Sequence, residues 1–207
     1  MQQVILTHGL WVPGAVMQPL AARLARAGYR CRTYSYMGAG EPLEAHAEGL
    51  ARFAREVGPA HFVAHSMGGL VVLEALNRLP EMAAGRVVLL GTPANGCFAG
   101  RRIARHAAGR WFLGKSEGLW REGRIAQWRR PEALGIVAGS LPLGLGRLLG
   151  ALPGVNDGVV SLEETAVEGM ACRTVLPVGH SHMLFSALVA QQVVEFLAHG
   201  KFASDPA

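Results

Sequence analysis

The sequence predicts an α/β fold, a mostly parallel six-stranded sheet with helices on both faces. Short apolar segments alternate with longer segments in which apolar residues recur every three or four positions. This alternation is typical of strands followed by covering helices. The first apolar segment, Val4–Thr7, is continuous, as expected for a strand buried in a parallel sheet. With no internal repeat and no clear linker, we expect a single domain over residues 1–207.

Glycine and proline residues separate the expected elements. The expected strands comprise residues 4–7, 31–36, 61–64, 87–90, 136–138 and 174–178. Helical spacing predicts a helix from Pro13 to Gly28, one over Leu43–Val57, one ending at Leu79 and one carrying Leu188–Leu197. Residues 141–153 are expected to form a Gly/Leu-rich connector, and the tail from Ser204 to be frayed.

The composition restricts the class of protein. The chain has 207 residues, is half hydrophobic and carries a net charge of +5, so a folded, basic domain is expected rather than disorder. A basic balance permits contact with nucleic acid or anionic membranes. However, the sequence has no nucleic-acid-binding motif, no metal-type Cys/His spacing and no phosphate loop. We therefore expect no nucleic-acid partner, no metal and no organic cofactor.

The cysteines and the N-terminal residues indicate the cellular compartment in which the protein is expected to lie. Cys31, Cys97 and Cys172 are odd in number and widely separated, which argues against a disulfide framework and favours a reducing environment. The first residues lead directly into a strand without a basic leader, and no window of about 18 apolar residues occurs. These observations predict a cytoplasmic protein without a transmembrane helix.

A serine marks the junction between the third strand and its helix. The apolar segment ending at Ala64 is followed by His65, Ser66, two glycines and apolar residues at helical spacing. A serine on such a sharp turn faces the helix N-terminus, where unpaired N–H groups favour negative charge. The positions two before and two after it, Ala64 and Gly68, are small, as this crowded crossing requires. The alternative interpretation is a serine that only caps the helix.

The segment Ala64-His65-Ser66-Met67-Gly68-Gly69 resembles the nucleophile elbow of α/β-hydrolases. More narrowly, it resembles small bacterial lipases and esterases whose elbow begins with Ala. The resemblance implies a Ser-His-Asp triad that cleaves carboxylic esters of lipid or medium-chain acyl type through an acyl-enzyme. A thioesterase or acyltransferase would share this triad. A non-catalytic membrane-surface or binding module is a third alternative.

Asp157 is the candidate acid. The chain contains only two aspartates, and Asp205 lies in the tail at its end. Asp157 lies between the fifth and last strands, in Asn-Asp-Gly-Val-Val, which resembles the turn that carries the acid in many small lipases. A simple Asn-Asp-Gly turn is the alternative. Glu163 and Glu164 are the substitute candidates.

His180 is the candidate base, with His182 as its competitor in Gly-His-Ser-His. His180 comes directly after the last strand, where the resemblance places the base. A base of this kind takes the serine proton, and an acid holds its tautomer. His65 is expected to pack or form a hydrogen bond near the cleft. The other expectations are that His46, His106 and His199 face solvent.

Two backbone N–H groups are the candidate oxyanion donors, those of Met67 and Leu10. Met67 follows the serine, and His8-Gly9-Leu10 resembles the His-Gly entry of the loop after the first strand. Trp11 is a neighbouring alternative to Leu10, and His8 is expected to order this loop. The turn over residues 91–96, Gly-Thr-Pro-Ala-Asn-Gly, is expected to shape the acyl pocket.

Residues 97–131 interrupt the strand–helix pattern and form an expected helical insert. They contain nine basic residues, two acidic residues and three tryptophans. One interpretation is a lid whose apolar side chains cover the cleft while Arg101, Arg102 and Arg105 face water or an anionic lipid surface. The other is a pair of ordinary amphipathic helices with a solvated basic face. The sequence leaves both open, together with the oligomeric state.

Overall fold

The computed structural model describes residues 1–121, 126–143 and 152–203, and within them a single sheet has the strand order β2-β1-β3-β4-β5-β6. All neighbouring strands are parallel. The strands are β1 (Gln3–Thr7), β2 (Arg30–Tyr34), β3 (Ala60–His65), β4 (Ala84–Leu90), β5 (Leu134–Gly139) and β6 (Cys172–Leu176). The prediction of a mostly parallel six-stranded sheet is confirmed.

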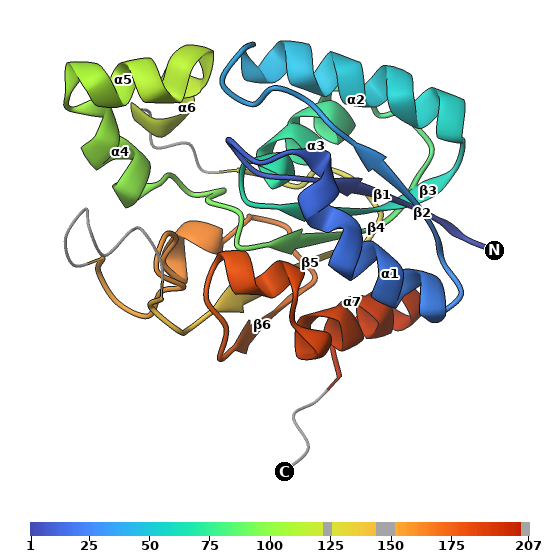
Figure 1. Ribbon diagram of the computed structural model, residues 1–207. Helices are drawn as coiled ribbons and strands as arrows, with labels where there is room; N and C mark the ends of the chain where they lie inside the picture. Colours follow the sequence, from blue (N-terminus) through green and yellow to red (C-terminus); the bar gives the residue numbers. More distant parts are fainter. Residues whose placement is uncertain (122–125, 144–151, 204–207) are drawn as a thin grey trace.

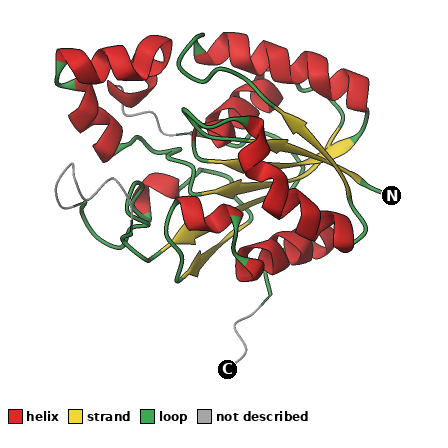
Figure 2. Cartoon of the chain, viewed as in Figure 1, coloured by secondary structure: helices red, strands yellow, loops and turns green. Residues whose placement is uncertain are grey.

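Helices cover both faces of this sheet (Figure 1). One face packs against α1 (Gln18–Arg26) and α7 (Ala187–His199), and the other against α2 (Leu43–Val57) and α3 (Met67–Arg78). Strand β3 shows how alternation produces these two cores, because Phe62 and Ala64 join the α2–α3 core while Val63 joins the α1–α7 core. The result is a helix–sheet–helix arrangement (Figure 2).

Three short helices follow β4 and lie together beside the sheet, at the upper left of Figure 1. They are α4 (Phe98–Ala104), α5 (Ala107–Leu113) and α6 (Glu117–Arg121), with a 3₁₀ turn η2 (Gly114–Ser116) before α6. Their buried residues form a small separate core that includes Cys97, Leu113 and Trp120 and extends to Met67 at the start of α3. The expected insert is therefore helical as far as residue 121. Residues 122–125 of it lie outside the described part, and residues 126–131 form no helix.

Some boundaries differ from the expected ones for local reasons. Strand β6 ends at Leu176 instead of residue 178, because Pro177 has no N–H to donate to a neighbouring strand. The segment after Pro13 begins as a 3₁₀ turn, η1 (Gly14–Met17), before α1. Further 3₁₀ turns are η4 (Glu163–Thr165), which precedes β6, and η5 (Ser181–Leu184), which precedes α7. Most of the expected connector and the tail from Ser204 lie outside the described residues.

None of the helices in the described ranges is long and apolar enough to cross a membrane.

The start of α3 lies very close to the backbone at the end of β1. A Cβ added at Gly68 would lie 2.5 Å from the carbonyl oxygen of His8 and 2.8 Å from that of Thr7. At the next position, a Cβ on Gly69 would overlap the side chain of Thr92. Only glycines allow α3 to begin here, and this beginning determines where Ser66 lies.

We predict that Gly68→Ala lowers the free energy of unfolding by about 1–3 kcal/mol, because the added methyl group meets backbone that cannot rotate away. Gly118→Ala is the matched control: this glycine lies in α6, and nothing lies within 4 Å of its added Cβ. The control should leave stability unchanged or raise it by up to about 1 kcal/mol through helix propensity. Urea unfolding measures both, and equal stabilities for the two variants would contradict the prediction.

Candidate active site

Ser66 is held in a strained conformation between β3 and α3. Its φ is 56° and its ψ −128°, and the other non-glycine residue with positive φ in the described ranges is Trp11. The Ser66 N–H donates to the carbonyl oxygen of Leu90 at 2.9 Å. The side chain is partly exposed and makes no capping hydrogen bond to α3, so the alternative of an ordinary capping serine is not supported. Strain of this kind concentrates at functional sites.

Asp157 is buried, at 1% exposure, and each of its carboxylate oxygens is bonded. Oδ1 accepts the N–H groups of Val159 at 2.9 Å and Val160 at 2.7 Å. Oδ2 accepts from Nδ1 of His180 at 2.7 Å, and the Asp157 carbonyl oxygen accepts the His180 N–H at 2.8 Å. The turn after the acid therefore fixes the carboxylate, and the carboxylate fixes the histidine.

The structure distinguishes the two candidate bases by their surroundings. His180 is 7% exposed, lies at the N-cap of η5 and is paired with Asp157. His182 lies within η5, and its side chain is exposed. Because the Nδ1–H of His180 is directed at the carboxylate, its Nε2 is left for another partner.

Gly91 packs directly against this acid–histidine pair. It has a φ of 54°, and a Cβ there would lie 2.9 Å from Oδ2 of Asp157 and 3.1 Å from Nδ1 of His180. The sequence had indicated only a turn shaping the acyl pocket at residues 91–96. The signal that points to this contact is the position of Gly91 directly after β4, at the sheet edge where the other candidate residues lie.

Ser66 and His180 are not joined by a hydrogen bond in the described part of the chain. Their proximity follows from the position of His65, which directly precedes Ser66 in the chain. The ring centroid of His65 lies 4.7 Å from that of His180. In sites without substrate, bonds between nucleophile and base are often long and shorten on binding.

The substitute acids are used elsewhere. Glu164 is buried, and its carboxylate accepts the N–H groups of Ser161, at 2.9 Å, and Phe98. It also lies 3.8 Å from the guanidinium of Arg101 in α4. Glu163 is exposed. Glu164 thus ties the start of the helical insert to the turn that carries Asp157, a contact that the sequence did not indicate.

The two residues that carry the candidate oxyanion donors, Leu10 and Met67, both lie close to Gly38. A Cβ added at Gly38 would lie 3.3 Å from Cα of Leu10 and 3.7 Å from Sδ of Met67, so both residues border the same small space. The Leu10 N–H donates no hydrogen bond within the described residues, and Met67, the first residue of α3, has an N–H without a helical partner. A Cβ on Gly9 would lie 3.4 Å from Oγ of Ser66.

His8 orders this loop as a neutral imidazole. Its Nε2 accepts the N–H of Tyr36 at 3.1 Å, so its proton is on Nδ1 and is donated to the carbonyl oxygen of Gly9 at 2.8 Å. The Tyr36 hydroxyl donates to the His8 carbonyl oxygen at 2.8 Å, and the two rings stack with centroids 4.6 Å apart. Burial is the largest influence on the His8 ring and lowers its pKa. With both nitrogens occupied, His8 is not available as a second base.

His65 lies beside His180, and it is buried, at 5% exposure. Its Nε2 is 3.1 Å from the carbonyl oxygen of His180. Burial, followed by the charge of neighbouring His180, lowers the pKa of His65 to about 3. The ring is therefore neutral at ordinary pH.

The expectation for His46 is wrong, while His106 and His199 are exposed as expected. His46 is 5% exposed, and its ring centroid lies 4.6 Å from that of Tyr36. It shares a face of α2 with Leu43 and Leu50, at spacings of three and four residues. A histidine within an apolar helical stripe is carried into the core with its neighbours.

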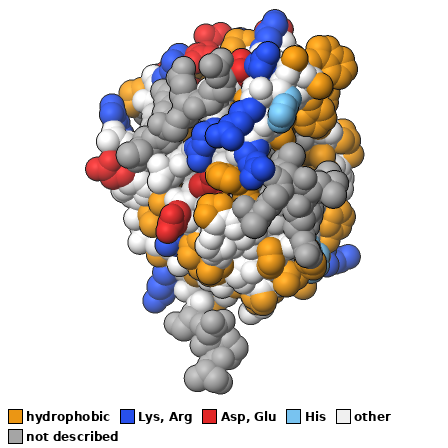
Figure 3. Space-filling model, turned by 90° about the vertical axis from the view of Figure 1, so that its left-hand side faces the viewer, with side chains coloured by type: hydrophobic (Ala, Val, Ile, Leu, Met, Phe, Trp, Pro, Cys, Tyr) orange, Lys and Arg blue, Asp and Glu red, His pale blue; other side chains and the backbone are white. Residues whose placement is uncertain are grey.

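The helical insert exposes aromatic side chains beside cations. Trp111 is 83% exposed, and Phe112 contacts Trp11 of the loop after β1, with ring centroids 5.1 Å apart. Arg102 and Arg105 are exposed at the end of α4. Figure 3 shows this face of the molecule, where Lys and Arg side chains gather beside exposed hydrophobic ones.

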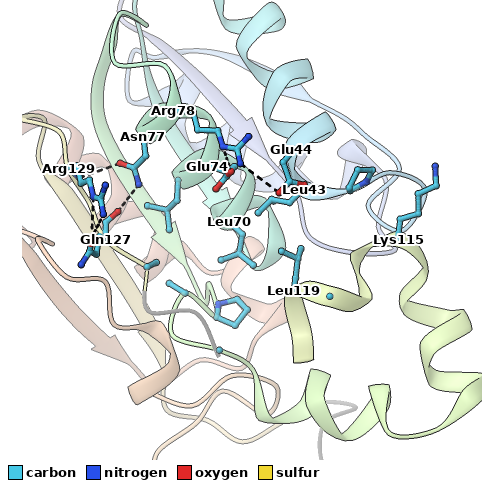
Figure 4. A pocket seen from close by; sticks show the side chains of 17 residues that line it. Leu43, Glu44, Leu70, Glu74, Asn77, Arg78, Lys115, Leu119, Gln127 and Arg129 are labelled. Carbon is cyan, nitrogen blue, oxygen red and sulfur yellow. Dashed lines mark hydrogen bonds and ion pairs between the residues drawn. The ribbon is translucent and has the colours of Figure 1, made fainter. Parts of the chain in front are cut away.

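A pocket of about 660 Å³ runs along α3 beside the insert (Figure 4). Leu70 and Leu119 line one part of it, and ion pairs of Arg78 with Glu74 and Glu44 lie at another. Its lining also includes Pro93, Ala94 and Gly96 of the turn expected to shape an acyl pocket, but none of Ser66, Asp157 and His180. Within the described residues, no group of three His, Cys, Asp or Glu side chains is arranged to hold a metal ion.

The parallel sheet and the strained serine beside an acid–histidine pair are features of a hydrolase of the α/β class. A family model described as "Alpha/beta hydrolase family" matches residues 4–153. The chain belongs to this family.

Solved structures with the same fold include lipases and esterases. The mature form of lipase BlEst2 from Bacillus licheniformis has a TM-score of 0.78 at 16% identity, covering 97% of this chain and 92% of that one. Its propeptide form has a TM-score of 0.82 at 17% identity, with 100% of this chain but only 52% of that chain covered. A thermophilic esterase from Thermogutta terrifontis has a TM-score of 0.68 at 15% identity, with coverages of 96% and 90%. A search of curated protein sequences found no match.

We predict that His65 makes stability depend on pH. Its pKa is lower in the folded than in the unfolded protein, so its contribution is complete above the ordinary histidine pKa and is lost as pH falls below that value. Between about pH 7 and about pH 5, the native protein should lose about 2 kcal/mol more free energy of unfolding than His65→Gln. Urea unfolding at both pH values measures the difference, and parallel losses in the two proteins would contradict the prediction.

Proposed function

We propose that this hydrolase cleaves carboxylic esters of lipid or medium-chain acyl type, with Ser66 as nucleophile, His180 as base and Asp157 as acid. The observation that carries the proposal is the buried 2.7 Å contact between His180 Nδ1 and Asp157 Oδ2, at the same sheet edge as the strained Ser66. Such a pair fixes the tautomer in which Nε2 can accept a serine proton. The comparisons support a hydrolase, and the ester substrate and these roles are our proposal.

The proposed reaction begins when Ser66 Oγ attacks the acyl carbon and its proton passes to His180 Nε2. The N–H groups of Leu10 and Met67 stabilise the negative charge that develops on the acyl oxygen. His180 then returns the proton to the departing alkoxide, which leaves as the alcohol, and an acyl-enzyme remains. Water, deprotonated by His180, attacks this ester, so that the acid is released and Ser66 regains its proton.

Thioester hydrolysis or acyl transfer to another alcohol would use the same residues and intermediate, and would differ only in the leaving group or in the acceptor.

We also propose that the insert binds the acyl chain and contacts a lipid surface. Trp111 and Phe112 are exposed on α5, and Arg102 and Arg105 are exposed at the end of α4. Exposed aromatic rings and cations on one segment suit an anionic lipid surface. We further propose a single hydrolase domain with residues 97–131 as a lid. The three cysteines are free, in keeping with a cytoplasmic location, which also remains a proposal.

The first test is covalent labelling. A fluorophosphonate probe should modify one serine, and peptide mapping should place it at Ser66, with no labelling in Ser66→Ala. A chain-length series of p-nitrophenyl esters, run beside acyl-CoA thioesters, then identifies the acyl group and the leaving group. A native protein that is never acylated, yet binds anionic vesicles as well as Ser66→Ala does, would instead be a non-catalytic surface module.

The second test distinguishes His180 from His182 as the base, and Asp157 from Glu164 as the acid. His180→Ala should lose nearly all turnover, while His182→Ala, which changes an exposed side chain, should retain it. Asp157→Asn should lower kcat by about 10⁴-fold through the wrong histidine tautomer. We expect no substitution by Glu164, because its carboxylate is already bonded to two backbone N–H groups outside the acid–histidine pair. Activity retained in His180→Ala but lost in His182→Ala would overturn the assignment.

A further inference from the structure

His65 is an unusual residue for its place in the core. It is the last residue of β3, and its side chain continues the row of His61 and Val63, which faces α1 and α7. Most of that face of the sheet is formed by apolar side chains such as Leu6 and Leu90. Burying an imidazole there costs free energy that an aliphatic side chain would not. A buried polar group in such a position calls for a specific explanation.

The contacts of the ring determine its tautomer. The nearest partner of Nε2 is the carbonyl oxygen of His180, at 3.1 Å, and a carbonyl oxygen can only accept. The proton of the neutral ring is therefore on Nε2. Nδ1 carries only a lone pair and has no hydrogen-bond partner in the described part of the chain. The ring also contacts the His180 ring, at 4.7 Å between centroids and 48° between planes.

We propose that His65 is the positioning residue of His180. Its Nε2–H holds the main-chain carbonyl of His180, and its ring supports the imidazole that Asp157 orients. Asp157 already holds His180 at two points, the N–H at 2.8 Å and Nδ1 at 2.7 Å. The bond from His65 fixes the carbonyl side of the same residue, so that both peptide groups and the ring are held. This inference rests on the proposed function.

The neutrality of His65 is part of the proposed role. In the proposed reaction His180 becomes an imidazolium, and a positive charge on a ring 4.7 Å away would oppose its formation. Burial keeps the pKa of His65 at about 3, so this opposing charge is absent. The position therefore requires a side chain that is neutral and carries a hydrogen-bond donor. Lys and Arg are excluded because they are charged, and aliphatic and phenyl side chains are excluded because they have no donor.

Three variants separate this role from simple packing. His65→Phe keeps a ring but removes the donor, whereas His65→Gln keeps a neutral N–H donor. His61→Phe is the matched control, because His61 is 8% exposed in the same row of β3 and accepts the N–H of Arg86 at 2.8 Å. Kinetics on a p-nitrophenyl ester that the native protein hydrolyses provide kcat and KM for each.

We expect His65→Phe to lower kcat by about 10- to 100-fold, as for small misplacements of catalytic groups, with KM changed by less than about twofold. His65→Gln should recover kcat to within about threefold of native, because it restores the donated hydrogen bond. His61→Phe should keep the native kcat. A native kcat in His65→Phe would overturn the proposal, and so would equal losses in the Phe and Gln variants or an equal loss in His61→Phe.

A measurement on the unaltered protein covers the case in which His65→Phe does not fold. Spectra of ¹⁵N-histidine-labelled protein, with the His65 signals assigned by their loss in His65→Gln, should show a neutral Nε2–H tautomer that does not titrate between about pH 5 and about pH 8. An Nδ1–H tautomer would overturn the proposal, because that form cannot donate to His180. A native protein without turnover or fluorophosphonate labelling would instead refute the proposed function, whereas the tautomer reports the contact independently of any reaction.

Discussion

The close approach of α3 to the end of β1 is the constraint on which the site depends. Because Gly68 has no side chain, the first turn of the helix can lie against the carbonyl oxygens of Thr7 and His8. This position forces Ser66 into its positive-φ conformation and places the start of α3 beside the loop after β1. The strain is offset by the apolar residues of α3, which the core encloses fully at Val71, Val72 and Leu76.

The same edge of the sheet holds several buried imidazoles, and their protonation states are set by the groups around them. Tyr36 fixes the tautomer of His8, the carbonyl oxygen of His180 fixes that of His65, and Asp157 fixes that of His180. Burial lowers the pKa of His8 and of His65. Among these three imidazoles, only His180 has a carboxylate as its hydrogen-bond partner. A cluster of chemically identical rings is thereby divided into two neutral donors and one ring that is paired with a carboxylate.

The parts of the fold and site that could be predicted from sequence are those encoded locally. Strand β3, Ser66, the glycines after it and helix α3 are consecutive, so their pattern indicated a turn that the structure contains. Asp157 was indicated by its position between the fifth and last strands and by the resemblance of its turn to that of small lipases, and the other aspartate lies near the end of the chain. Contacts between distant segments left no such signal, and nothing near Glu164 indicates a bond to the N–H of Phe98, 66 positions earlier. His46 was mispredicted because its polar type suggested solvent, whereas its place in the apolar stripe of α2 determined its burial.

The Glu164 carboxylate also restricts how the helical insert can behave. It holds the N–H of Phe98 at the start of α4 and the N–H of Ser161 in the segment that follows Asp157. Moving the start of α4 would leave a buried carboxylate without its partners, which is costly. The first turn of the insert is therefore fixed to the same segment as the acid. Any opening of the insert over the site would have to begin beyond α4, in the part that carries the exposed aromatic side chains of α5.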